Sequence, residues 1–162
     1  MTAHRATLLA LAEAMRARRW RLTTAESCTG GLLAAACTAL AGSSDWFERG
    51  FVTYSNEAKI ELLAVPAALI ARDGAVSGTV AAAMAAGALS RSPGDLALSI
   101  TGVAGPGGGS ERKPVGTVWL GHCVRGEAPR AVLLSLSGDR AAIRAASVSA
   151  ALERLIAFVD SG

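Results

Sequence analysis

Strand-like and helix-like segments alternate along the first part of this chain, and this order constrains the fold more than any other feature. A strand-like stretch at 21–25 precedes a helical stretch at 28–40, and the same order recurs at 46–54 and 57–63. Strands separated by helices usually pair in parallel, because the helix carries the chain back to the edge where the first strand began. The pattern therefore predicts an α/β protein.

The remaining segments extend the sheet and cover it. We expect further helices at 4–18, 66–72, 78–90 and about 137–158, and further strands at 95–101, 116–124 and 130–136. The last two strands flank residues 125–129, which are typical of a hairpin turn. Together the segments predict a mixed sheet of about five strands with helices on both faces, in one compact domain over 1–162.

Small side chains decide how these elements can pack. Alanine (35 residues) and glycine (18 residues) supply about a third of the chain, whereas only seven residues are aromatic. We therefore expect close contacts between helices and sheet, and helix faces that permit close packing between the subunits of a homo-oligomer. Hydrophobic residues make up 51% of the chain and charged residues 18%, which excludes a disordered protein.

The sequence also predicts a cytoplasmic location. The longest apolar run, at 80–89, is too short for a bilayer, which needs about 20 residues. The first residues do not contain a basic region followed by a continuous apolar stretch, so we expect no signal peptide. Three cysteines without Cys-x-x-Cys spacing, Cys28, Cys37 and Cys123, argue for reduced thiols.

The charged residues do not favour a nucleic-acid surface. The net charge is +3, and the basic residues are scattered apart from a cluster at 16–19, where the end of the first helix favours cations. Arginine outnumbers lysine by 14 to two, so Lys59 and Lys113 stand out. A lysine amine can lose its proton near neutral pH and a guanidinium cannot, which makes a retained lysine a candidate base.

Three segments carry residues suited to chemistry, and each lies where an expected strand ends. Ligands of open α/β sheets bind beyond the carboxyl ends of the strands. The first segment is Thr24-Ala-Glu-Ser-Cys-Thr-Gly-Gly31, in which Ser27 stands at a turn from strand to helix beside two glycines and the free N–H groups of the helix start. Ser27 is either a nucleophile or an ordinary N-cap of that helix.

The other two segments supply a lysine and a glycine-rich loop. In Tyr54-Ser-Asn-Glu-Ala-Lys59, Lys59 lies near a helix start, where the dipole and burial would lower its pKa; the alternative is a solvated surface lysine. At 99–109, a buried strand delivers Thr101 into a loop that either cradles phosphate on its N–H groups or is a flexible surface loop. This loop has neither P-loop nor dinucleotide-binding spacing.

Other catalytic chemistries have less support. With only His4 and His122 in the chain, a histidine-based triad is hard to build, and His122 lies in an expected strand. Cys28 has no evident histidine partner, so we expect it to be packed. No cluster of residues has metal-ligand spacing, and we expect neither a metal nor a cofactor. A serine hydroxyl with a lysine base remains, and this chemistry suits hydrolysis of an amide or ester.

The segments, in this order, resemble the CinA C-terminal domain family over about 5–158. The resemblance rests on Thr24–Gly31, Gly42-Ser-Ser44, Val52–Lys59, Gly74-Ala-Val-Ser77 with Ala83-Met-Ala85, Ser99–Gly108 and Lys113-Pro-Val-Gly-Thr-Val118. It implies a three-layer α/β/α sandwich. The characterised members are nicotinamide mononucleotide (NMN) deamidases, so it also implies an amidohydrolase that converts NMN to nicotinate mononucleotide and ammonia. Many members carry an N-terminal domain that resembles molybdopterin-binding proteins, to which the resemblance does not extend.

The same resemblance implies catalytic roles. Ser27 would be the nucleophile and Lys59 the general base, while Tyr54 and Thr101 would orient this pair or relay protons. Arg140 is a candidate phosphate ligand, because its guanidinium matches phosphate geometry; whether Arg140 or Lys113 contacts phosphate stays open. Backbone N–H groups would hold the phosphate or an oxyanion, and we expect them at Thr29, Gly30, Gly31, Gly105, Gly107 and Gly108.

Two other functions remain open at this point. The chain could be a nucleotide- or phosphate-binding module without turnover, linked to competence or DNA damage as the family name suggests. It could also hydrolyse a different small amide. In each case the expected partner is a small molecule, with no membrane and no nucleic acid.

Overall fold

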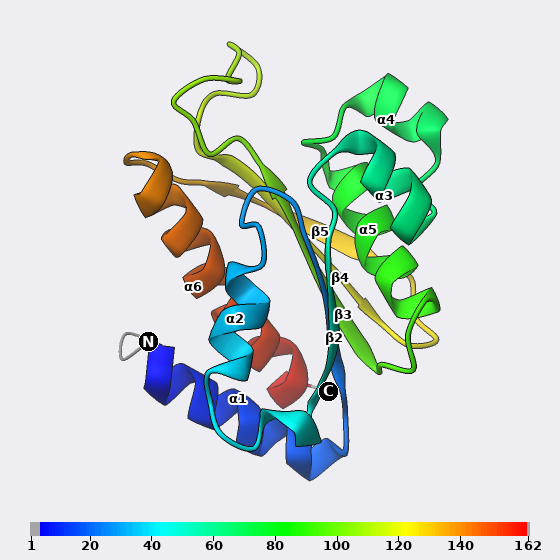
Figure 1. The fold of residues 1–162 in the computed structure, drawn as a ribbon, viewed down its shortest axis with the longest axis vertical. Helices are drawn as coiled ribbons and strands as arrows, with labels where there is room; N and C mark the ends of the chain where they lie inside the picture. Colours follow the sequence, from blue (N-terminus) through cyan, green and yellow to red (C-terminus); the bar gives the residue numbers. More distant parts are fainter. Residues whose placement is uncertain (1–3, 162) are drawn as a thin grey trace.

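The computed structural model describes residues 4–161, which form a five-stranded mixed sheet between two helical layers (Figure 1). The strands are β1 (Leu22–Glu26), β2 (Phe47–Val52), β3 (Leu96–Gly102), β4 (Thr117–Val124) and β5 (Arg130–Ser135). Their spatial order is β2-β1-β3-β4-β5. β1 runs parallel to β2 and β3, whereas β4 is antiparallel to both of its neighbours. The predicted α/β fold is confirmed.

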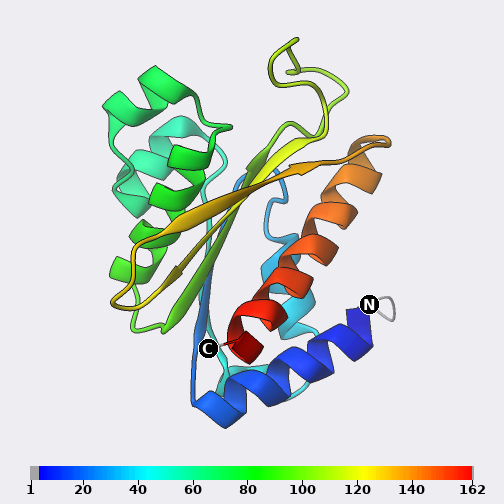
Figure 2. The same ribbon diagram turned by 180° about the vertical axis from the view of Figure 1, so that it is seen from behind.

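Helices cover both faces of the sheet, as predicted (Figures 1 and 2). One layer contains α1 (Arg5–Arg18), α2 (Leu32–Thr38) and α6 (Arg140–Ser161), and the other contains α3 (Asn56–Leu63), α4 (Ala67–Asp73) and α5 (Gly78–Ser90). A short 3-10 helix, η2 (Ser43–Asp45), follows α2. None of the helices between residues 4 and 161 combines the length and apolar character that a bilayer crossing requires.

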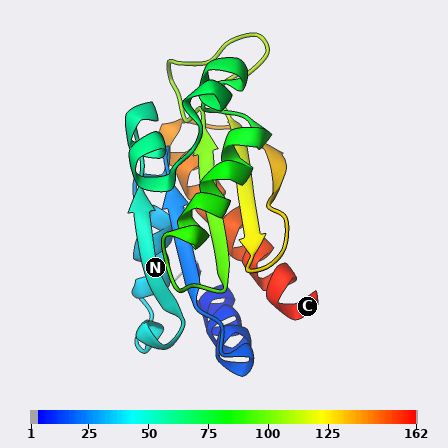
Figure 3. The same ribbon diagram turned by 90° about the vertical axis from the view of Figure 1, so that its right-hand side faces the viewer.

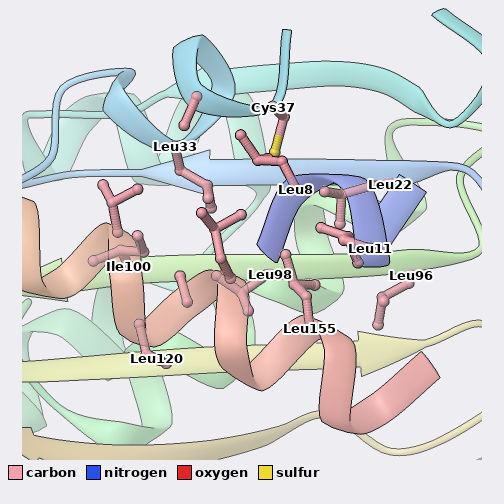
Figure 4. Close-up of a cluster of buried hydrophobic side chains, with 14 of the residues drawn as sticks. Leu8, Leu11, Leu22, Leu33, Cys37, Leu96, Leu98, Ile100, Leu120 and Leu155 are labelled. Carbon is pink, nitrogen blue, oxygen red and sulfur yellow. The ribbon is translucent and has the colours of Figure 1, made fainter. Parts of the chain in front are cut away.

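Each face of the sheet has its own hydrophobic core. The larger one joins α1, α2 and α6 to the sheet, and Figure 4 shows leucines of all three helices packed on those of β1, β3 and β4. The buried residues of α1 (Leu8, Leu11, Ala12 and Met15) recur at the helical spacing seen in the sequence. The smaller core lies under α3, α4 and α5.

Close contacts in this second layer require glycine. A β-carbon at Gly87 of α5 would lie 1.9 Å from the carbonyl oxygen of Leu63. One at Gly121 of β4 would lie 2.1 Å from the carbonyl oxygen of Ala81 in α5. Any larger residue at these positions would push α5 away from α3 or from the sheet. The expected small-sided packing is therefore present at both contacts.

The second helix departs from its predicted start. We expected it to begin at residue 28, but α2 begins at Leu32. Gly30 and Gly31 have φ values of +56° and +104°, so residues 28–31 form a turn that helical backbone cannot make. The helix expected at 28–40 is therefore shorter, with seven residues (Leu32–Thr38) that follow a glycine turn.

The topology brings the three segments with candidate functional residues (24–31, 54–59 and 99–109) together at one edge of the sheet. Figure 3 shows β1, β2 and β3 pointing the same way, with the glycine-rich loop and the start of α3 beyond their ends. In register, Glu26 at the end of β1 lies between Val52 of β2 and Ile100 of β3. The residues that follow these three strands are therefore neighbours in space.

Candidate active site

Ser27 is the first residue beyond β1. Its N–H donates to the carbonyl oxygen of Ile100 (2.9 Å), which ties the turn to β3. The residue is only 9% exposed, and its Oγ lies 3.0 Å from Nζ of Lys59. The N-cap of α2 is Gly31, so Ser27 does not cap this helix. The sequence left open whether Ser27 is a nucleophile or an N-cap, and the structure excludes the N-cap.

Lys59 lies in the first turns of α3 with its side chain buried under the helix start. The helix begins where the Ser55 hydroxyl accepts the N–H of Ala58 (3.0 Å). Lys59 is 1% exposed, which excludes a solvated surface lysine. Its Nζ also donates to the backbone carbonyls of Thr53 (2.9 Å), Tyr54 (3.2 Å) and Ser55 (3.4 Å). These carbonyls fix the amine beside Ser27.

Burial lowers the pKa of Lys59 from its ordinary value, because the ammonium loses its hydration. Cys28 and Glu57 act in the opposite direction, but less strongly. Within residues 4–161 no carboxylate forms an ion pair with the amine. A larger fraction of neutral amine, held 3.0 Å from a hydroxyl, is what a general base requires.

Cys28 is a poor alternative nucleophile. Burial raises the pKa of its thiol to about 11, so the reactive thiolate is scarce near neutral pH. Arg144 donates to the carbonyl oxygen of Cys28 (3.1 Å), which helps to fix the backbone of the turn after Ser27. The expectation that Cys28 is packed is confirmed by its 6% exposure.

Glu26, next to Ser27, was not singled out from the sequence. Its carboxylate is 1% exposed and accepts the N–H groups of Leu33 (2.9 Å) and Ala34 (3.0 Å) in the first turn of α2. It therefore replaces the N-cap side chain that Gly31 lacks and locks α2 to the end of β1. The sequence held no signal for this role, because the helix was expected from residue 28 with Ser27 directly before it as a candidate cap.

A cavity of about 280 Å³ opens beside Ser27 and Lys59. Its opposite wall is the glycine-rich loop between β3 and β4, and the residues between α4 and α5 close a third side. The lining residues are Ser27, Cys28, Tyr54, Asn56, Lys59, Ala75, Val76, Thr101–Gly105, Gly107, Gly108 and Arg140. Eight of the expected site residues are thus gathered here, with the three loop glycines among them.

Thr101, Tyr54 and Arg140 occupy distinct positions around the cavity. The buried hydroxyl of Thr101 donates to the carbonyl oxygen of Ala75 (2.9 Å). Tyr54 is 60% exposed at the rim, and its hydroxyl accepts from Arg140 (3.1 Å). Arg140 also donates to the carbonyl oxygen of Gly105 (2.7 Å). The arginine therefore links the two rims across the cavity mouth.

Four of the expected residues do not line the cavity. Thr29, Gly30 and Gly31 lie behind Cys28, where Gly30 packs near the guanidinium of Arg144. The N–H groups of Leu33 and Ala34 at the start of α2 are already taken by Glu26, so this helix end offers little to a ligand. Lys113 donates to the carbonyl oxygen of Asp73 (2.7 Å), outside the cavity. Of the two candidate phosphate ligands, only Arg140 therefore lines the cavity.

Over residues 4–161, no three His, Cys, Asp or Glu side chains are grouped so as to hold a metal ion. Fold and site together define a class of protein: a three-layer α/β/α sandwich with a serine and a buried lysine at the carboxyl edge of its parallel strands.

Comparison with known proteins gives the family. The chain matches the CinA C-terminal domain model over residues 5–159 and belongs to this family. It is 52% identical over 144 residues to the nicotinamide-nucleotide amidohydrolase PncC of Escherichia coli strain K12, covering 88% of this chain and 87% of that protein. It is also 54% identical to a CinA-like protein of Citrifermentans bemidjiense, covering 83% of this chain but 32% of that longer protein.

Solved structures agree with the fold. A CinA superfamily protein from Klebsiella pneumoniae superimposes with a TM-score of 0.92 at 40% identity, covering 96% of this chain and 97% of the other. A competence/damage-inducible protein from Agrobacterium tumefaciens gives a TM-score of 0.87 at 44% identity, over 93% of this chain and 94% of the other. The resemblance stated from the sequence is confirmed, and the chain is an amidohydrolase of this family.

Proposed function

We propose that this protein hydrolyses the carboxamide of NMN to nicotinate mononucleotide and ammonia, with Ser27 as nucleophile and Lys59 as general base. The observation that carries the proposal is the 3.0 Å separation between a buried lysine amine and a serine hydroxyl at the edge of a cavity. The name of the Escherichia coli relative, a nicotinamide-nucleotide amidohydrolase, supports the substrate.

The first half of the reaction forms an ester on Ser27. Lys59 accepts the hydroxyl proton while Oγ attacks the carboxamide carbon, and a tetrahedral intermediate results. When this intermediate collapses, the protonated Lys59 returns the proton to the departing nitrogen, so ammonia leaves. The backbone carbonyls of Thr53, Tyr54 and Ser55 surround Nζ, and a neutral amine that accepts from Ser27 can still donate to two of them, which keeps it near the same oxygen in both proton transfers.

The second half releases the acid. Water attacks the ester carbon with Lys59 again as the base, and the proton then returns to Oγ as the bond to Ser27 breaks. The products are nicotinate mononucleotide and the free hydroxyl. One buried base therefore serves both steps, as in other hydrolases that pair serine with lysine.

The facing wall would hold the phosphate. Arg140 lies at the mouth of the cavity, and its guanidinium can exchange the Tyr54 hydroxyl and the Gly105 carbonyl for phosphate oxygens. The N–H groups of Gly107 and Gly108 lie in the same wall, unobstructed by side chains. Thr101, held by Ala75, would orient the reacting groups at the floor.

We also place the protein in the cytoplasm as a homo-oligomer. The three cysteines are buried and unpaired, which suits a reducing compartment. The alanine-rich helix faces support close packing between subunits. Sedimentation equilibrium tests the oligomer, which would be contradicted by a monomer at all concentrations.

Ammonia release from NMN by the purified protein tests the reaction and the nucleophile together. We expect release from the wild type and from Ser149→Ala, a matched control whose hydroxyl contacts only the backbone of its own helix. We expect Ser27→Ala to lose about 10³-fold or more of kcat while still binding NMN.

Other outcomes separate the alternatives. Equal release from Ser27→Ala would remove Ser27 as the nucleophile but keep the reaction. Tight NMN binding without ammonia from any variant would instead favour a binding module. If NMN neither binds nor reacts, a panel of small amides tests the remaining alternative.

A further inference from the structure

A second cavity, of about 420 Å³, lies at the other end of the sheet from Ser27. It is bounded by Trp20 after α1, by the C-terminal part of α6 and by the hairpin between β4 and β5. In Figure 2 the glycine-rich loop stands at the upper end of the molecule, and this part of α6 lies toward the lower end. The two cavities share no lining residue.

The charges around this cavity favour an anion. Arg130 of β5 and Arg154 of α6 line it, and neither forms an ion pair within residues 4–161. The acidic residue in the lining is Glu127 of the hairpin. On the α1 side, Arg18 lies 4.8 Å from the centre of the Trp20 ring and adds a further positive charge.

His122 also lines the cavity, but its Nδ1 is turned away from the open space. Nδ1 of His122 is buried and has no hydrogen-bond partner in the part of the chain that the structure describes. The ring packs against Phe158 with 3.8 Å between centroids. Burial, with Arg154 and Arg130 in support, lowers the pKa of His122 to about 4, so the ring is neutral near pH 7.

The remaining walls suit an aromatic ring. Trp20, Phe158, Val124 and Val132 contribute apolar surface beside the two arginines. A volume of about 420 Å³ lies at the small end of the range for ligand sites. The occupant must therefore be compact, with a planar apolar part and a negative charge.

We propose that this cavity is a binding site for a small aromatic carboxylate, with the ring beside Trp20 and Phe158 and the carboxylate between Arg130 and Arg154. The His122 ring would lie in the wall next to this ligand. In the sheet, His122 pairs with Leu98, three residues before Thr101, or about 10 Å along β3. A ligand here would therefore not touch Ser27, and the proposal stands independently of the reaction proposed above.

Nuclear magnetic resonance of the histidine side chains tests this site directly, because the chain has only two histidines, His4 and His122. The probes are benzoate, benzamide and acetate; benzamide keeps the ring without the charge, and acetate keeps the charge without the ring. We expect benzoate to shift the His122 signals saturably and to raise the pKa of His122 above about 4, since its carboxylate offsets the arginines. Benzamide and acetate should bind at least about 10-fold more weakly.

Two variants make the result decisive. Arg154→Gln should weaken benzoate binding by about 10-fold or more, whereas Arg112→Gln, an exposed arginine of the glycine-rich loop, should not change it. Circular dichroism checks that both variants fold. Ammonia release from NMN should be unchanged in Arg154→Gln, which keeps a failure here distinct from a failure of the proposed reaction.

Several results would overturn the proposal. They are equal affinity for benzoate and benzamide, equal affinity of the wild type and Arg154→Gln for benzoate, and no saturable shift of His122. A His122 signal that changes with protein concentration but not with benzoate would show that a second copy of the chain covers the cavity instead.

Discussion

The two walls of the candidate active site are built in opposite ways. One wall consists of buried side chains at the ends of regular elements, where Lys59 and Ser27 are fixed by contacts between 2.9 and 3.4 Å. The other is a glycine-rich loop attached through two long side chains, Arg140 to the carbonyl of Gly105 and Lys113 to that of Asp73. The contrast teaches that Ser27 and Lys59 are supported by regular elements, whereas the facing wall is a loop to which the start of α6 adds Arg140.

Steady-state kinetics of variants in each wall tests this comparison. Substitutions in the rigid wall should lower kcat, because they remove groups that act in the transition state. Substitutions in the loop wall should raise KM and leave kcat nearly unchanged, because they remove binding that ground state and transition state share. A loop variant that lowered kcat alone would contradict the division.

The largest effect after loss of the nucleophile is expected for Lys59→Arg, which should lower kcat by about 10³-fold. A guanidinium keeps the positive charge but cannot accept the Ser27 proton. The matched control is Lys113→Arg, the same substitution at the other lysine, where the cation can still donate to Asp73. Steady-state ammonia release measures both. Full activity of Lys59→Arg would make Lys59 an electrostatic contact rather than a base.

Arg140→Gln should raise KM for NMN by about 10- to 100-fold. A charge-assisted hydrogen bond to phosphate contributes roughly 1.5–3 kcal/mol, and the neutral amide cannot replace it. Arg112→Gln, in the glycine-rich loop between β3 and β4, is the control, because that side chain does not line the cavity. An unchanged KM for Arg140→Gln would move phosphate binding elsewhere on the protein.

Glu26→Gln should lower the free energy of unfolding by roughly 1–3 kcal/mol. One carboxylate oxygen becomes an NH₂ group that faces the N–H of Leu33 or Ala34, so one buried donor loses its acceptor. Urea denaturation measures the change against Glu61→Gln, an exposed position on α3. Equal stability of the two variants would show that α2 does not depend on this carboxylate.

The smallest effect, a few-fold increase in KM, is expected for Lys113→Met. The substitution releases the loop from Asp73 without touching the cavity lining. Limited proteolysis should then cut faster within residues 105–113. A large fall in kcat without faster cleavage would place Lys113 in the reaction itself.

Sequence patterns were sufficient for the fold, and they pointed to Ser27 and Lys59 as the candidate reacting pair. Short apolar and β-branched stretches between turn residues predicted every strand of the sheet, because strands covered by helices are buried. The scarcity of lysine drew attention to Lys59, and its burial explains why this position holds an amine rather than a guanidinium. The 3.0 Å approach to Ser27, however, depends on three backbone carbonyls that no local pattern reveals.

The placement of backbone groups was the part that sequence could not supply. Thr29, Gly30 and Gly31 were expected to offer N–H groups to a ligand, but Gly30 and Gly31 turn the chain away behind Cys28. The role of Glu26 depends on a contact seven and eight residues along the chain, across that same turn. Both features follow from positive φ values, which a sequence permits but does not specify.

Direct titration of Lys59 tests the central claim, that a buried neutral amine activates Ser27. The protein has two lysines, so isotopic labelling of lysine gives two side-chain signals, and Lys113→Arg assigns them. Burial should bring the pKa of Lys59 below the ordinary lysine value of about 10.4, and kcat/KM should rise with pH through the same pKa, because only the neutral amine accepts a proton. A Lys59 pKa at or above the ordinary value would contradict the account, as would a rate profile that follows another group.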